Sequence, residues 1–194
     1  MNRRQLLSGI ATACVSGWGA SAKLFADEGT QTGLGLVTYC QSLRRKQRLT
    51  HPDAVDLFDP LTFLQHCRSL GAGGMQVAIG VLQSADASRL RQECEQQEMF
   101  LEAIISLPRD AAGVDQFRTE MQSARNSGAR AVRCVIIPGR RYEQFHSLAE
   151  FHRAEAAGRQ MLKMAAPIAE SLRLPLAVEN HKDHRNVERV RLFE

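Results

Sequence analysis

The sequence predicts an α/β fold in which five short strands alternate with helices. Apolar or β-branched runs recur along the chain and are bounded by glycine, proline or charge, which is typical of strands. We expect strands at residues 34–39, 73–79, 99–107, 129–137 and 174–181. Helical apolar spacing lies between them, at about 59–70, 85–98, 110–127 and 146–172. Strands that alternate with helices pair in parallel through right-handed crossovers.

Several residues predict where the helices begin and end. Asp59 before Pro60 is typical of an N-cap followed by proline in the first helical position. Gly71 and Gly128 lie where helices should stop. Pro167 falls inside the last helical segment and is expected to kink or divide it.

Polar residues within the strands favour a barrel over an open, doubly wound sheet. No GxGxxG loop follows the first strand, and "GAGG" at 71–74 precedes a strand instead. Alternation places Gln76, Glu102, Arg133 and Glu179 opposite the apolar residues of their strands. Charge on a helix-covered face would be costly, whereas a barrel collects such residues in a polar interior. We therefore predict a partial (β/α)8 barrel of about five βα units.

Two interpretations of these inward residues stay open. Glu102 and Arg133 could form a structural ion pair, or both could contact a substrate. His181 shares the inward face with Glu179, two residues away, and could touch a substrate, orient Glu179 or be structural. Asp183 is expected to cap a helix that begins near His184.

Residues 1–26 have the pattern of an export signal. Arg3 and Arg4 precede Leu6 and Leu7, an Ala-, Gly- and Ser-rich stretch follows, and the segment holds no acidic residue. The arginine pair resembles a twin-arginine signal, which predicts a periplasmic or secreted protein. The alternative is a basic tail.

The basic charge belongs mostly to that segment. The chain of 194 residues carries a formal net charge of +4, and without Arg3, Arg4 and Lys23 the remainder is close to neutral. We therefore expect no nucleic-acid partner. No stretch reaches the roughly 20 apolar residues of a membrane span. The cysteines at 40, 67, 94 and 134 form no CxxC pair, which predicts free, buried thiols.

Five segments together resemble a known family. They are "LGLVTYC", "GAGGMQVAI", "FLEAIISLP", "RCVIIPGRRYEQF" and "LPLAVENHKDHR". From residue 33 to 194 the chain is similar to the N-terminal part of the sugar phosphate isomerase/epimerase family of xylose isomerase-like TIM barrels. The resemblance implies a divalent metal (Mn, Mg or Zn) that assists proton transfer on a small keto sugar through an enediolate.

The resemblance also implies roles for particular residues. Glu179, in "AVENH", corresponds to a glutamate that binds the metal and lies close to the moving proton. Tyr39 is placed beside the substrate pocket. Strand alternation, rather than the resemblance, makes the inward residues of that pocket candidate substrate-binding residues, namely Gln76, Glu102, Arg133 and His181. The loop at 140–142 would lie over the pocket, either meeting an anionic group or remaining solvated.

A complete barrel has about 250 residues and eight strands. We therefore expect a truncated family member, inactive alone, whose other metal ligands would lie on strands six to eight. The alternative is a non-catalytic carbohydrate-binding or assembly protein that completes its barrel with another chain, and a homo-oligomer is one form that this pairing could take. A related metal-dependent endonuclease activity on abasic DNA is disfavoured by the export signal and the near-neutral charge.

Overall fold

The computed structural model of the chain describes residues 32–51 and 53–193. The signal predicted over residues 1–26 lies outside this part. The prediction of an α/β fold is confirmed, because five parallel strands form one sheet in the order β1-β2-β3-β4-β5 and alternate with helices. This arrangement is consistent with part of a βα barrel.

The strands fall within about two residues of each predicted start. They are β1 (Thr32–Val37), β2 (Ala72–Val77), β3 (Phe100–Ile104), β4 (Ala131–Val135) and β5 (Leu176–Glu179). The helices are η1 (Thr38–Gln41), α2 (Ser42–Thr50), α3 (Pro60–Ser69), α4 (Ser84–Gln96), α5 (Gly113–Asn126), α6 (Arg141–Gln144), α7 (Leu148–Ser171) and α8 (Asn186–Val190).

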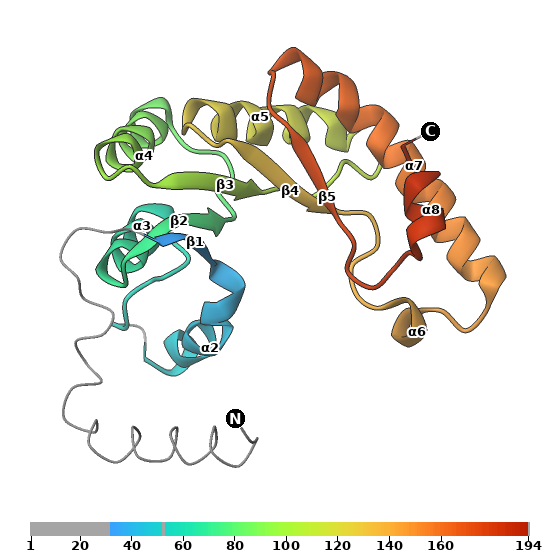
Figure 1. Ribbon diagram of the computed structural model, residues 1–194, viewed down its shortest axis with the longest axis horizontal. Helices are drawn as coiled ribbons and strands as arrows, with labels where there is room; N and C mark the ends of the chain where they lie inside the picture. Colours follow the sequence, from blue (N-terminus) through green and yellow to red (C-terminus); the bar gives the residue numbers. More distant parts are fainter. Residues whose placement is uncertain (1–31, 52, 194) are drawn as a thin grey trace, which may run out of the picture.

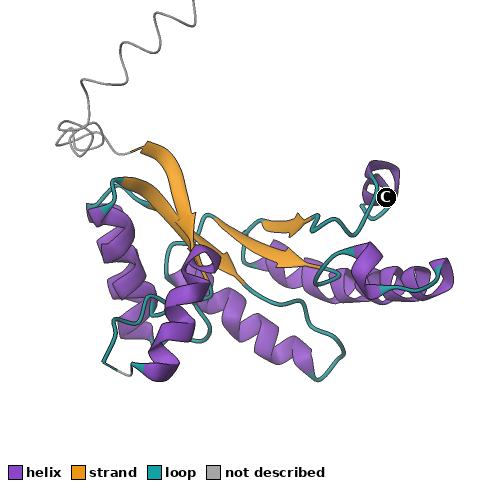
Figure 2. Ribbon diagram, turned by 90° about the horizontal axis from the view of Figure 1, so that it is seen from below, coloured by secondary structure: helices purple, strands orange, loops and turns teal. Residues whose placement is uncertain are grey.

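The sheet curves, and helices α3, α4, α5 and α7 follow its convex side (Figure 1). The view from below shows the strands lying above these helices (Figure 2). We call the helix-covered side the outer face and the opposite side the inner face. The two ends of the curved sheet are β1 and β5, so within the described residues the sheet is open rather than closed into a barrel.

The alternation predicted from the sequence is visible in the burial of β3 and β4. In each strand the second and fourth residues are buried and the other three are half-buried. The outer-face residues Met75, Leu101 and Val132 are at most 1% exposed. They pack in one core with helical residues that include Phe63 and Phe117. Burial of such side chains stabilises each by roughly 1.5–3 kcal/mol, so the outer face carries most of the stabilisation.

Three predicted helix boundaries are confirmed. The Asp59 carboxylate accepts hydrogen bonds from the Thr62 backbone N–H at 2.8 Å and from the Thr62 hydroxyl at 2.7 Å, which caps α3. Gly71 and Gly128 follow α3 and α5 with φ of +70° and +81°, a conformation that glycine adopts without steric cost.

Other boundaries differ from prediction. α7 continues through Pro167, so this proline does not divide the helix, although the Lys163 carbonyl loses its helical donor there. α8 begins at Asn186 after Arg185, and Asp183 is not its cap. Instead the Glu188 carboxylate accepts from the Arg185 backbone N–H at 2.8 Å. The chain also turns into η1 directly after Val37, so strand one ends earlier than expected.

The described cysteines are all free, as predicted. Cys67, Cys94 and Cys134 are buried, whereas Cys40 is exposed and departs from the expectation of a buried thiol. Burial raises the pKa of Cys67 and Cys94 to about 11 and that of Cys134 to about 12. The buried thiols therefore stay protonated and unreactive at neutral pH. Among the described helices, none has the length and apolar character needed to cross a bilayer.

Candidate functional site

The candidate site lies on the inner face, where β4 and β5 end. Glu179 is the last residue of β5, and parallel strands bring their carboxyl ends to one edge of the sheet. Arg133 pairs in register with Ala177, two residues before Glu179, on the same face. The sequence thus places a cation and a carboxylate diagonally opposite each other on neighbouring strands.

Three of the predicted site residues come together here. The Arg133 guanidinium donates from Nε to Oε2 of Glu179, and its Nη2 forms an ion pair with the same oxygen. His181 Nδ1 lies 3.2 Å from Oε1 of the same carboxylate. Both carboxylate oxygens are therefore engaged, one by a permanent cation and the other by an imidazole. The side chains are 28%, 35% and 48% exposed for Arg133, Glu179 and His181, so solvent and small molecules reach all three.

The surroundings of Glu179 favour its charged form. Burial by itself raises the pKa of this carboxyl, but hydrogen bonds from His181 and Arg133 and the charge of Arg133 outweigh burial. The pKa of Glu179 therefore lies below its usual range, and the group is a carboxylate at neutral pH. A ligand that takes the donors of Arg133 would remove this stabilisation and make Glu179 a stronger base.

A second polar cluster lies on the same face nearer the amino ends of the strands. Gln76 and Glu102 are paired in register on β2 and β3, and the Gln76 amide donates to Glu102 Oε2 at 3.0 Å. Arg130 donates to Glu102 Oε1 from Nε at 2.9 Å and from Nη2 at 2.6 Å. The ion pair considered between Glu102 and Arg133 is therefore not formed, because Arg133 lies further along the sheet, opposite Ile104.

Arg130 and Phe100 belong to this second cluster, and sequence reasoning missed both. Arg130 fell inside the strand expected at 129–137, where alternation places it opposite Arg133 on the outer face, but β4 begins at Ala131 and Arg130 precedes it. Its guanidinium lies 3.6 Å from the centre of the Phe100 ring. That ring covers Gly74, where an added Cβ would collide with it. The paired glycines of "GAGG" were the available signal, since such residues often mark close approach of another group.

These residues line a small pocket of about 260 Å³ with Gly35 and Val37 of β1. Burial raises the pKa of Glu102, but the bonds from Arg130 and Gln76 outweigh it and leave the pKa below its usual range. Tyr39 joins neither cluster. It lies in η1 with 81% of its surface exposed.

The described residues do not by themselves fit a divalent metal. Among residues 32–51 and 53–193, no group of three or more His, Cys, Asp or Glu could hold a metal ion. Glu179 is also bonded to a guanidinium, whose positive charge takes the place next to the carboxylate that a cation would need. A metal bound by Glu179 would require ligands that the described residues do not supply.

Comparison with known proteins adds no family to this geometry. The sequence matches no family model, and no curated protein matches it. The resemblance to sugar phosphate isomerases and epimerases therefore remains a prediction. What stands independently of it is a parallel βα sheet with two carboxylate clusters on its inner face.

Proposed function

We propose that this chain is a sugar isomerase/epimerase-like protein that moves a proton on a keto sugar through an enediolate. The observation that carries the proposal is the cluster of Arg133, Glu179 and His181 at the carboxyl ends of β4 and β5. In parallel βα folds, ligands bind at this edge of the sheet. An exposed carboxylate between a cation and an imidazole has the components for proton abstraction next to a carbonyl.

The proposed step uses the residues of this chain alone. The carbonyl oxygen of the sugar takes donors of Arg133, which frees Glu179 Oε2. Glu179 removes the proton from the adjacent carbon, the C–H electron pair forms the new C=C bond, and the carbonyl oxygen becomes an oxyanion held by Arg133. The proton then returns from Glu179 to the original carbon or, once the neighbouring hydroxyl has passed its proton to the oxyanion, to the former carbonyl carbon. His181 contributes by holding Oε1. We assign no step to a metal, because the described residues do not fit one.

Solvent exchange tests this proposal directly. The full chain is incubated in D2O with a panel of keto sugars and keto sugar phosphates, with and without Mn²⁺, Mg²⁺ or Zn²⁺, and loss of the C–H signal is followed by NMR. We expect exchange with at least one substrate and a loss of about 10²–10⁴-fold in Glu179→Gln. Glu102→Gln is the matched control, since it removes the same charge from the same face outside the reacting cluster.

Comparison of the exchange with and without added metal distinguishes a reaction that uses Arg133 alone as the electrophile from one that also needs a metal ion. Exchange without added metal would show that Arg133 suffices as the electrophile. Exchange that needs a metal would mean that ligands outside the described residues take part. Exchange that is equal in the wild type and in Glu179→Gln would rule out the proposed role of Glu179.

The second candidate is a non-catalytic carbohydrate-binding or assembly protein. It is favoured by the engagement of both Glu179 oxygens and by the position of β5 at an edge of the described sheet, where its outer backbone groups could pair with another chain. Sugar binding without exchange would support binding alone. Light scattering would detect assembly, because a mass of one chain at all concentrations rules out completion by a second copy.

The proposal includes export through the twin-arginine pattern of residues 1–26. Replacement of Arg3 and Arg4 by lysine keeps the charge but removes the arginine pair that the export receptor reads. We expect delivery to the periplasm to stop in this variant. Unchanged delivery would exclude the twin-arginine route.

A further inference from the structure

A separate pocket of about 460 Å³ opens where the loop after β4 meets the loop after β5. Its walls come from α6, the start of α7 and residues 182–185. The two loops are tied together by a hydrogen bond from the Arg141 backbone N–H to the Lys182 carbonyl at 3.2 Å. None of the residues assigned to the two inner-face clusters lines this pocket.

Three basic side chains line the pocket, namely Arg141, Lys182 and Arg185. A single carboxylate, Glu188, bonds both guanidiniums, at 2.8 and 3.1 Å to Arg141 Nη1 and at 2.7 and 3.0 Å to Arg185. Lys182 has no ion-pair partner among the described residues. Glu188 therefore fixes the two arginines in place, and the three basic groups still outnumber the two carboxylates when the lining Asp183 is counted with Glu188.

The Arg141 guanidinium is held with donors to spare. Its planar group lies 3.5 Å from the centre of the Phe151 ring, and only Nη1 bonds to other described residues. A stacked, pre-oriented guanidinium loses little entropy when it binds an oxyanion through its remaining N–H groups. The free N–H groups of Arg141 are thus already oriented to donate hydrogen bonds to an oxyanion.

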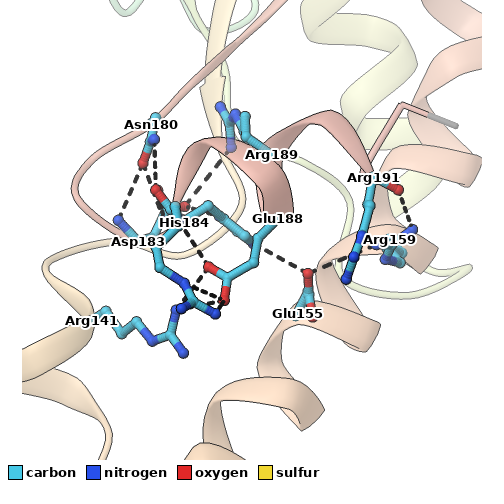
Figure 3. A network of polar contacts seen from close by, with 10 residues as sticks. Arg141, Glu155, Arg159, Asn180, Asp183, His184, Glu188, Arg189 and Arg191 are labelled. Carbon is cyan, nitrogen blue, oxygen red and sulfur yellow. Dashed lines mark hydrogen bonds and ion pairs between the residues drawn. The ribbon is translucent and has the colours of Figure 1, made fainter.

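Unsatisfied buried atoms gather at the same place. Among the described residues, the buried side-chain atoms that lack a hydrogen-bond partner are Asp183 Oδ2, both ring nitrogens of His184 and Arg189 Nη1. Figure 3 shows these residues around the start of α8. Asp183 and His184 line the pocket, and their side chains are fully buried. These atoms face one another, with His184 Nδ1 3.0 Å and Arg189 Nη1 4.0 Å from Asp183 Oδ2. A neutral imidazole holds one donor and one acceptor, so the group is a buried polar cluster behind the pocket and does not itself add donors for a ligand.

The remaining walls are suited to an organic molecule rather than a bare ion. Phe145, Leu148 and Phe151 supply apolar surface. The N-terminus of α7, a helix of 24 residues, adds a favourable field for an anion. Ser147 and Glu150 already cap that end, with Ser147 Oγ accepting from the Glu150 N–H at 3.2 Å, so the basic side chains supply most of the recognition.

We infer that this pocket binds the phosphate group of a small organic molecule. The inference does not depend on the proposed proton transfer, because it uses different residues. The phosphate oxygens accept from Arg141, Lys182 and Arg185, and the organic part lies against the aromatic wall. Phosphate oxygens accept charge-assisted hydrogen bonds from arginine and lysine, which are the donors that this pocket wall presents.

Calorimetric titration of the full chain with inorganic phosphate at pH 7 tests the inference. We expect saturable binding that weakens at least tenfold in the double variant Lys182→Gln/Arg185→Gln. Both side chains are exposed, and Glu188 keeps its bond to Arg141, so this variant should fold. Circular dichroism checks that it does.

The matched control is Lys163→Gln/Arg118→Gln, which removes two exposed positive charges elsewhere on α7 and α5. Unchanged binding in this control supports a defined site. Equal weakening in both double variants, or no saturable phosphate binding by the wild type, would overturn the inference. Tighter binding of a sugar phosphate than of inorganic phosphate would show that the aromatic wall contributes.

Discussion

Glu102 and Glu179 lie on the same face of the same sheet, yet their surroundings differ. Glu102 lies within β3 and is bonded by Gln76 and Arg130, neither of which changes charge near neutral pH. Glu179 ends β5 and is bonded by Arg133 and by the imidazole of His181. We therefore expect the Glu102 cluster to be structural and the Glu179 cluster to be the one that a ligand can contact.

The difference arises from position along the strand. Beside Glu102 the Phe100 ring covers the inner face of the sheet. The ring packs against Gly74, and the Arg130 guanidinium stacks over it. Beside Glu179 the neighbouring inner-face residue of β5 is Ala177, which is exposed. A carboxylate therefore becomes structural or accessible according to the neighbours that the register supplies.

The largest change in stability should come from adding a side chain beside Glu102, where the Phe100 ring packs tightly against the sheet. Gly74→Ala places a methyl group in the Phe100 ring and should cost about 1–3 kcal/mol in the free energy of unfolding. Ala177→Val adds more atoms at the open end and should change stability by less than about 0.5 kcal/mol. Urea unfolding measures both. Similar losses in the two variants would contradict the division into a tight and an open end.

A third carboxylate, Glu188, is expected to make the largest contribution of the three to the loss of folding stability in acid. Burial raises its pKa, but bonds from Arg185 and Arg141 outweigh burial and hold the pKa at about 2, below the ordinary 4.5. A lowered pKa in the folded state means that the stabilisation is complete above pH 4.5 and is lost as pH falls toward 2. Glu102 and Glu179 act in the same direction.

Unfolding midpoints in urea between neutral pH and pH 2 test this order. We expect the wild type to lose stability below pH 4.5 and Glu188→Gln to lose less over the same range. Glu102→Gln should flatten the curve to a smaller degree. A curve for Glu188→Gln that runs parallel to the wild type would show that this carboxylate is not held in its charged form.

At neutral pH the two inner-face carboxylates should contribute unequally to stability. Glu102→Gln disrupts a two-pronged bond with Arg130 and should cost about 1–2 kcal/mol. Glu179→Gln removes a carboxylate that is itself more exposed, 35% against 25% for Glu102, and should cost less than about 1 kcal/mol. Thermal and urea unfolding of both variants would measure this difference. A larger loss in Glu179→Gln would reverse the comparison and make its cluster the structural one.

The smallest effect is expected at His181. Its side chain is 48% exposed and contacts Glu179 at 3.2 Å. His181→Gln should therefore leave the free energy of unfolding within about 0.5 kcal/mol of the wild type. Ligand binding or proton exchange would be the property that changes. A large stability loss would indicate a structural histidine.

Strand alternation predicted much of this arrangement. The five strands, the apolar outer face and the inward position of Gln76, Glu102, Arg133 and Glu179 all follow from a period of two. Which inward residues pair with each other could not be predicted, because the pairing depends on the stagger between strands. That stagger sets Arg133 against Ala177 rather than beside Glu102.

Features outside regular strands were harder to predict. Arg130 reaches the inner face from a loop, and α2 carries the polar sequence SLRRKQRLT, in which Leu43 and Leu49 are the apolar residues. Asp183 follows a strand and precedes a helix, which suggested a cap, but its carboxylate is buried beside His184 instead. Such positions are decided by tertiary packing, on which a local pattern carries little information.

The strand order β1-β2-β3-β4-β5 has a consequence for how the protein is made. Each strand pairs with the one that precedes it in the chain, so every addition to the sheet joins a surface already synthesised. Among the five described strands, none has to wait for a distant partner, which keeps loop-closure entropy small at each step. The described part of the chain can therefore fold progressively on the ribosome, one strand and helix at a time.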